Sequence, residues 1–119
     1  MSFDWSEYLT IARFLAEDGI VATAGGARRS AVSRAYYAAY GHARSHASRN
    51  LGFVPHRRAD DHERLCDHLE THRHPDEADT LRELRRWRNR CDYNDSVGAL
   101  EGLVAASIAG AGEIITRLA

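Results

Sequence analysis

An arginine-rich segment in the second half of the chain offers the most chemistry. Residues 81–90 contain one acidic residue, Glu83, and a group of five arginines. The group consists of Arg82, Arg85, Arg86, Arg88 and Arg90. Guanidinium groups stay charged and bind phosphate through paired hydrogen bonds. The segment therefore indicates an anion-binding surface; the alternative is that a GC-rich genome explains why every basic residue of the chain is arginine.

One of these arginines, Arg88, stands where a helix would place an apolar side chain. Leu81, Leu84, Arg88 and Cys91 follow one another at helical steps of three or four residues. A buried guanidinium without a partner is costly, so Arg88 must pair with a carboxylate, face a cleft or lie at a subunit interface. Two interpretations remain open: an internal ion pair, most obviously with Asp92 one turn later, and an anion site.

The histidines are the next candidates for proton transfer or metal binding. His62 and Cys66 are four residues apart, as are His68 and His72, a spacing that places two ligands on one face of a helix. A second tight pair of cysteines is missing. We therefore expect no metal and no cofactor. We expect most histidines to lie on a solvated face, except His42 and His46, because the second helix is expected to be central.

Glycines and prolines divide the chain into five segments with helical periodicity. The expected helices cover Trp5 to Asp18, Ala27 to Ser48, Asp60 to Thr71, Pro75 to Asp92 and Val97 to Leu118. Asp4 is the expected cap of the first helix, and Asp95 or Ser96 that of the last. No segment shows the alternation of a strand. The sequence predicts one all-α domain over residues 1–119, an antiparallel bundle of about five helices.

Apolar stripes predict which faces of these helices turn inward. In the first helix the stripe consists of Tyr8, Ile11, Ala12 and Leu15. The second helix carries alanines that allow a neighbouring helix to come close, beside three tyrosines for which core or interface packing is expected and base stacking is the alternative. These are Tyr36, Tyr37 and Tyr40. One bundle cannot easily cover all these groups together with Trp87, so we expect a homodimer through the second and fourth helices.

Composition narrows the class of protein. A chain of 119 residues can bury its own core, and two cysteines suit a reducing compartment better than a disulfide framework. No apolar run approaches the roughly 18 residues of a membrane span, and the first residues do not form a secretion signal, so we expect a cytoplasmic protein. The net charge of −1 argues against a generally basic nucleic-acid binder.

Two segments resemble signatures of the HEPN family of small bacterial proteins linked to RNA. Residues 33–40, Ser-Arg-Ala-Tyr-Tyr-Ala-Ala-Tyr, are similar to the family's second-helix signature. Residues 84–93, Leu-Arg-Arg-Trp-Arg-Asn-Arg-Cys-Asp-Tyr, are similar to its second signature, in which an Arg-Asn pair precedes an Ala-Asp-Tyr-like end. The resemblance covers nearly the whole chain. It implies an HEPN-like helical bundle that often dimerises through its two central helices.

The resemblance also implies a test for ribonuclease activity. Many members of the family are metal-independent ribonucleases whose motif is an arginine and a later histidine with four to six residues between them. Arg88 and Asn89 match its start, but the corresponding window holds Tyr93, Asn94 and Asp95. Attack by the RNA 2′-hydroxyl needs a base with a pKa near neutrality, which histidine supplies and tyrosine, with a pKa of about 10, does not. The anion-binding half of the motif is retained and the proton-transfer half is lost.

We therefore expect a dimeric module that binds RNA or a protein partner in a toxin–antitoxin or phage-defence system. The expected anion- and RNA-binding residues are Arg85, Arg86, Arg90 and Arg34. The alternative is a metal-independent endoribonuclease toxin that uses a substitute acid or base. Its candidate catalytic residues are Arg88, Asn89, Asp92 and Tyr93, or a histidine of the second helix. The resemblance implies an antitoxin, a nucleotidyltransferase or a larger effector as the protein partner.

Overall fold

Five helices make up the regular structure of residues 3–18 and 25–119, the part of the chain that the computed structural model describes. They are α1 (Ser6–Glu17), α2 (Gly25–Asn50), α3 (Asp61–Thr71), α4 (Pro75–Tyr93) and α5 (Leu100–Arg117). Each bound lies within three residues of the expected one, and the same ranges contain no strand. The predicted all-α class is confirmed.

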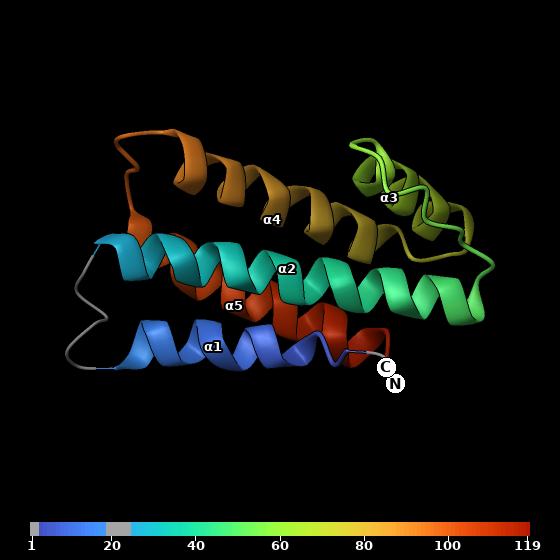
Figure 1. Cartoon of the computed structure of the whole chain (residues 1–119), viewed down its shortest axis with the longest axis horizontal. Coiled ribbons are helices and arrows are strands. Elements are labelled where there is room, and N and C mark those ends of the chain that lie inside the picture. Colours follow the sequence, from blue (N-terminus) through green and yellow to red (C-terminus); the bar gives the residue numbers. More distant parts are fainter. Residues whose placement is uncertain (1–2, 19–24) are drawn as a thin grey trace.

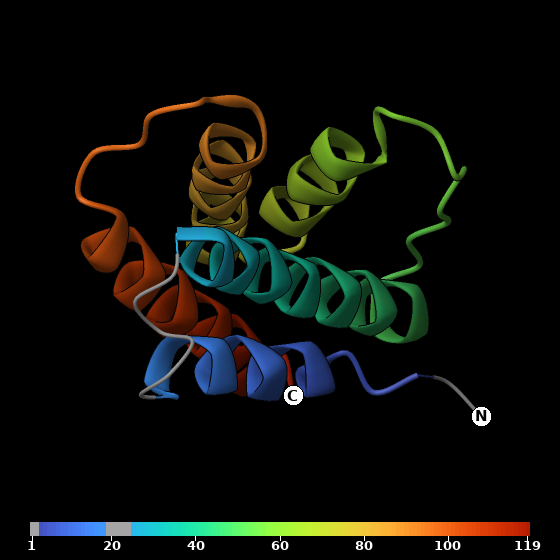
Figure 2. The same cartoon turned by 60° about the vertical axis from the view of Figure 1, so that its left-hand side comes forward.

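Helix α2 lies at the centre of the bundle. Helices α1 and α5 pack on one side of it, and α4 packs on the opposite side with α3 beside it (Figures 1 and 2). Helices α1 and α4 both run antiparallel to α2 (Figure 1). Helix α3 contacts α4 more extensively than it contacts α2, so its position depends mainly on α4.

Small residues on α2 allow this close packing. Its buried alanines, Ala35, Ala38, Ala39, Ala43 and Ala47, form one core with leucines from α3 and α4 and with Ile114 of α5. Gly41 is required where the Trp5 ring crosses α2, because a Cβ there would lie 2.0 Å from Trp5 Cδ2. Most apolar groups of α2 that led us to expect a dimer are therefore covered within one chain. The dimer itself stays a prediction.

Two expectations about local structure are wrong. The first concerns α1, where Ile11 was expected to face inward but is 43% exposed. The helix is rotated so that Leu9 and Ala12 are buried instead. The second concerns α5, which begins at Leu100 rather than Val97. Ala99 before it adopts a left-handed conformation with φ 55°, so Asp95 and Ser96 lie in the connection and do not cap the helix.

The expected cap of α1, Asp4, lies just before the helix and bonds to Ser6. Asp4 Oδ1 accepts hydrogen bonds from the Ser6 backbone N–H at 3.0 Å and from the Ser6 hydroxyl at 2.6 Å, so the expected cap lies two residues before the helix begins, and Trp5 occupies the cap position. Across the part of the chain that is described, we find no helix with the length and apolar character needed to cross a membrane.

Candidate anion-binding site

Arg88 is held by its own helix and by two tyrosines. Its Nε donates a hydrogen bond of 3.0 Å to Asp92 Oδ2, and the two side chains are 19% and 29% exposed. Its guanidinium lies over the rings of Tyr36 and Tyr37, 5.5 and 5.1 Å from their centroids. The internal ion pair that the sequence left open is therefore present, and it lies at the edge of the core.

Arg29, which the sequence analysis did not single out, fixes the end of α4. Its guanidinium donates hydrogen bonds to the carbonyl oxygens of Cys91 at 2.6 Å, Asn94 at 2.6 Å and Asp95 at 2.9 Å. These contacts satisfy carbonyls that a helix end leaves without partners. They position the turn that carries the candidate residue Tyr93, whose side chain points outward and is 74% exposed.

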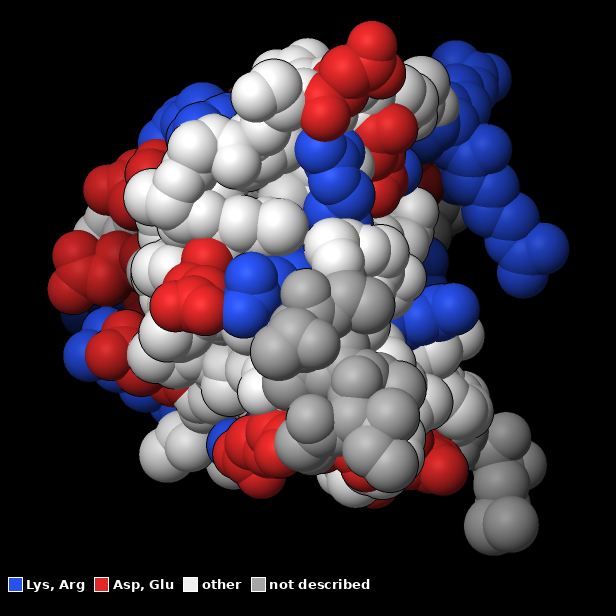
Figure 3. All heavy atoms as spheres, turned by 90° about the vertical axis from the view of Figure 1, so that its left-hand side faces the viewer, with Lys and Arg blue, Asp and Glu red and all other residues white. Residues whose placement is uncertain are grey.

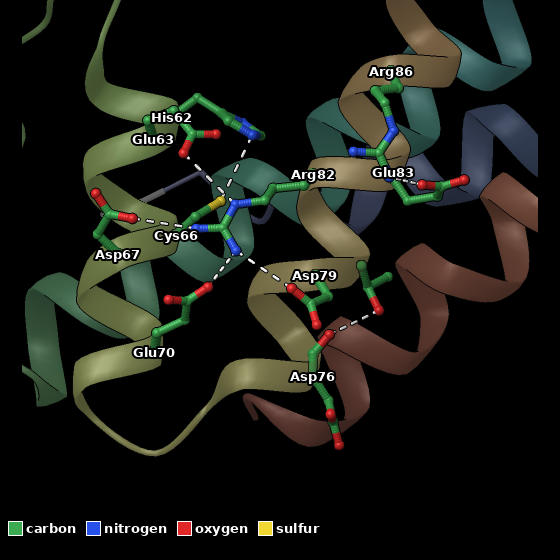
Figure 4. Close-up of polar contacts among 11 residues, drawn as sticks. His62, Glu63, Cys66, Asp67, Glu70, Asp76, Asp79, Arg82, Glu83 and Arg86 are labelled. Carbon is green, nitrogen blue, oxygen red and sulfur yellow. Dashed lines mark hydrogen bonds and ion pairs between the residues drawn. The ribbon is translucent and has the colours of Figure 1, made fainter.

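Arg82 is neutralised by carboxylates and ties α3 to α4. Figure 4 shows its guanidinium among Glu63, Asp67 and Glu70 of α3 and Asp79 of its own helix. The distances are 3.6 Å to Glu63, 3.2 Å to Asp67 and 3.3 Å to Asp79, with a further hydrogen bond to Glu70. The hydrogen bond to Glu70 is the main reason that the pKa of Arg82 is raised above its ordinary value. The positive charge of Arg82 is therefore compensated by carboxylates of the protein itself.

The remaining arginines of α4 are more accessible. Arg86 pairs with Glu83 on the same helix, at an exposed position (Figure 4). Arg85 and Arg90 form no hydrogen bond or ion pair with any residue in the described ranges. Between α3 and α4 lies a small pocket of about 230 Å³. It is lined by His62, Glu63, Arg82, Arg85, Arg86 and Asn89. The structure thus brings three of the predicted site residues together and adds a histidine from another helix.

That histidine, His62, is buried and already bonded through both ring nitrogens. Its Nδ1 lies 2.8 Å from the Tyr36 hydroxyl, and its Nε2 lies 3.6 Å from Cys66 Sγ. The ring stacks on Tyr40 with centroids 5.9 Å apart. Burial, assisted by the positive charge of Arg85, lowers the pKa of His62 to about 4. The imidazole is therefore neutral at neutral pH and is a weak base.

Most of the other histidines are also turned inward, so the expected solvated histidine face is wrong. Among the seven, His56 is exposed and the rest are buried or half-buried. Three of them, His42, His68 and His72, bond to backbone carbonyls through a ring nitrogen. His42 Nε2 lies 3.0 Å from Leu118 O, and His68 Nε2 lies 2.6 Å from Leu51 O. These contacts tie chain ends and loops to the helices, which explains their burial.

The spacing of His62 and Cys66 does place them on one face. Together with Glu63 they offer three ligand atoms within 4.8 Å of one another. Arg82 Nε lies 3.6 Å from the Glu63 carboxylate, and burial raises the pKa of the Cys66 thiol to about 12. The guanidinium competes with a cation for the carboxylate, and the thiol resists ionisation, so the surroundings favour the apo arrangement. The expectation of no metal stays a prediction.

A second row of arginines follows the exposed side of α2. Arg34, a predicted RNA-binding residue, lies over the Tyr8 ring at 5.3 Å. Arg44 lies over the rings of Trp5 at 5.1 Å and Tyr40 at 5.3 Å. In Figure 3 arginine side chains protrude along the upper right edge of the molecule, whereas the left edge carries acidic side chains mixed with basic ones. Positive charge is therefore gathered locally on a chain whose net charge is −1.

Comparison with family models, curated proteins and solved structures gives no match for this chain. The geometry of the site and the chemistry of its residues are therefore the basis on which a function is inferred.

Proposed function

We propose that this chain is an HEPN-like RNA-binding module that does not itself cleave RNA. The proposal is based on which arginines of α4 are paired with carboxylates and which are not. Arg82, Arg86 and Arg88 are paired with carboxylates, whereas Arg85 and Arg90 have no partner within the described ranges. A guanidinium without a carboxylate partner is free to bind a phosphate of the RNA backbone.

The same geometry gives less support to cleavage, the alternative function. Two of the candidate catalytic residues, Arg88 and Asp92, are bonded to each other. The histidine in the α4 pocket, His62, has its pKa lowered to about 4, far from the value that suits a general base at neutral pH. Its ring nitrogens are also occupied by Tyr36 and Cys66. The chemistry of the site is thus better suited to holding an anion than to moving a proton.

The proposed module acts as a homodimer through α2 and α4 and works with a partner protein of a toxin–antitoxin or phage-defence system, such as an antitoxin, a nucleotidyltransferase or a larger effector. Two half-buried aromatic residues, Tyr37 of α2 and Trp87 of α4, support this surface because they retain area for a second copy to cover. Light scattering at micromolar concentration should give twice the mass of the chain. A monomer under these conditions contradicts the dimer without affecting the proposed RNA binding.

One experiment separates binding from cleavage. A 3′-labelled single-stranded oligoribonucleotide is mixed with the protein, and the same samples are read by fluorescence anisotropy and then by denaturing gel. We expect saturable binding with the RNA intact. Cleavage that is abolished by Arg88→Ala would instead establish the ribonuclease, and the absence of both binding and cleavage would remove the support for either function.

A further inference from the structure

A second pocket lies between α2 and the segment that leads to α3, away from the α4 arginines. Its volume is about 530 Å³, within the range of pockets that hold small ligands. It is lined by Tyr40, Arg44, Pro55, Arg57, Arg58 and Asp61. Three arginines therefore face one carboxylate, an excess of two positive charges on the lining.

The carboxylate is already committed to the fold. Asp61 is buried and accepts hydrogen bonds from the backbone N–H of His56 at 3.1 Å, from that of Arg57 at 2.7 Å and from Arg64 Nη1 at 2.8 Å. Burial alone would raise the pKa of Asp61, but these donors lower it, so the group stays ionised. Asp61 thus folds residues 56 and 57 back over α3, and Arg57 adopts a left-handed conformation with φ 58°.

The three guanidinium groups of the pocket have no carboxylate of their own. Arg44, Arg57 and Arg58 form no ion pair with any residue that the structure describes. Arg44 is oriented by the rings of Trp5 and Tyr40, so its position costs little further ordering when a ligand binds. Like charges that share a pocket repel one another unless an anion compensates them. The pocket is therefore poised for an anion.

We propose that this pocket binds a phosphomonoester, the doubly charged phosphate found at the 5′ end of an RNA strand or on a free nucleotide. A phosphomonoester carries a charge near −2 at neutral pH, and its three terminal oxygens suit several guanidinium donors. It therefore compensates more of the positive charge of Arg44, Arg57 and Arg58 than a singly charged carboxylate ligand would. The inference does not depend on RNA binding by α4, because Arg85 and Arg90 are not part of this pocket.

The test compares two ligand pairs on the full chain. Adenosine 5′-monophosphate is titrated against adenosine by calorimetry, and a 3′-labelled oligoribonucleotide with a 5′-phosphate is compared with the same strand bearing a 5′-hydroxyl. We expect the phosphate to strengthen binding by about tenfold or more, which corresponds to about 1.4 kcal/mol. Binding of the mononucleotide identifies a free nucleotide as a sufficient ligand; a preference seen with the oligonucleotide alone identifies an RNA end.

Two matched double variants complete the design. Arg57→Gln with Arg58→Gln should abolish the preference for phosphate, and the loop should persist because Asp61 holds it through backbone N–H groups. Arg13→Gln with Arg117→Gln, which removes two exposed arginines outside the pocket, should leave the preference intact. If the preference for phosphate persists in Arg57→Gln with Arg58→Gln, or is absent in the wild type, the pocket is not a phosphate site, even if RNA still binds. Mononucleotide binding without any binding of 5′-hydroxyl RNA contradicts the proposed RNA module and leaves the pocket standing. Melting curves and circular dichroism confirm that each variant is folded.

Discussion

The contact between Arg88 and Asp92 allows a quantitative prediction for Arg88→Ala. An i, i+4 ion pair contributes roughly 0.5 kcal/mol, and each contact of a guanidinium with an aromatic ring contributes roughly 0.5–1 kcal/mol. Arg88 makes one such pair and lies over two rings, Tyr36 and Tyr37. We therefore expect the free energy of unfolding to fall by about 2 kcal/mol. A fully buried pair would cost about 3–5 kcal/mol when broken.

The companion variant Asp92→Asn separates the two contributions. It removes the ionic contact but keeps Arg88 on the rings of Tyr36 and Tyr37, so the expected loss is only about 0.5 kcal/mol. Urea unfolding of both single variants and the double variant, followed by circular dichroism, gives the coupling energy directly. Equal losses above 4 kcal/mol would show a buried ion pair, and no loss for Arg88→Ala would show that the ring contacts do not stabilise the fold. Either result refutes the reasoning.

Three further predictions follow from buried groups. The free energy of unfolding should fall by up to ~3 kcal/mol as the pH is lowered from about 6.5 to about 4, because the unfolded chain protonates His62 in this range and the folded chain does not. Urea titrations at several pH values measure this dependence, and His62→Gln should make it flatter than in the wild type. Gly41→Ala should destabilise the protein by about 1–3 kcal/mol and shift tryptophan fluorescence to the red, because the added Cβ displaces the Trp5 ring. If that ring moved freely, the helix preference for alanine would instead stabilise the protein by about 1 kcal/mol. Elemental analysis of the purified protein should find no stoichiometric zinc, and a full equivalent would contradict this expectation. Cys66 is buried and the pKa of its thiol is raised, so it should react with a thiol reagent only after unfolding.

The parts of the structure that depend on local pattern could be predicted. Helical periodicity, glycines and prolines located the five helices, and the four-residue step from Arg88 to Asp92 identified the ion pair as one of two alternatives. The inward face of α1 was placed wrongly at Ile11, because an apolar stripe defines a direction only loosely and the crossing with α2 decides its final rotation.

The contacts that shape the candidate site join distant residues, and periodicity carries no signal for them. Arg29 reaches carbonyls more than 60 residues further along the chain, and Arg82 reaches carboxylates on a different helix. The pocket around Arg57 exists because Asp61 folds its loop, and nothing in the spacing of Arg44 and Arg57 indicates that they meet. Which arginines are free and which are neutralised therefore became apparent only from the fold.

The salt dependence of RNA binding shows whether the unpaired arginines of α4 bind the RNA backbone. The affinity for one single-stranded oligoribonucleotide is measured by anisotropy between 50 and 200 mM salt, approximate limits at which counterion release is readily seen. We expect the slope of log affinity against log salt to flatten by about 1.4 in Arg85→Gln with Arg90→Gln, since each lost phosphate contact removes about 0.7 for a single strand. Arg13→Gln with Arg117→Gln, which removes two exposed arginines elsewhere, should leave the slope unchanged. An identical slope in both double variants would show that Arg85 and Arg90 do not contact the RNA backbone.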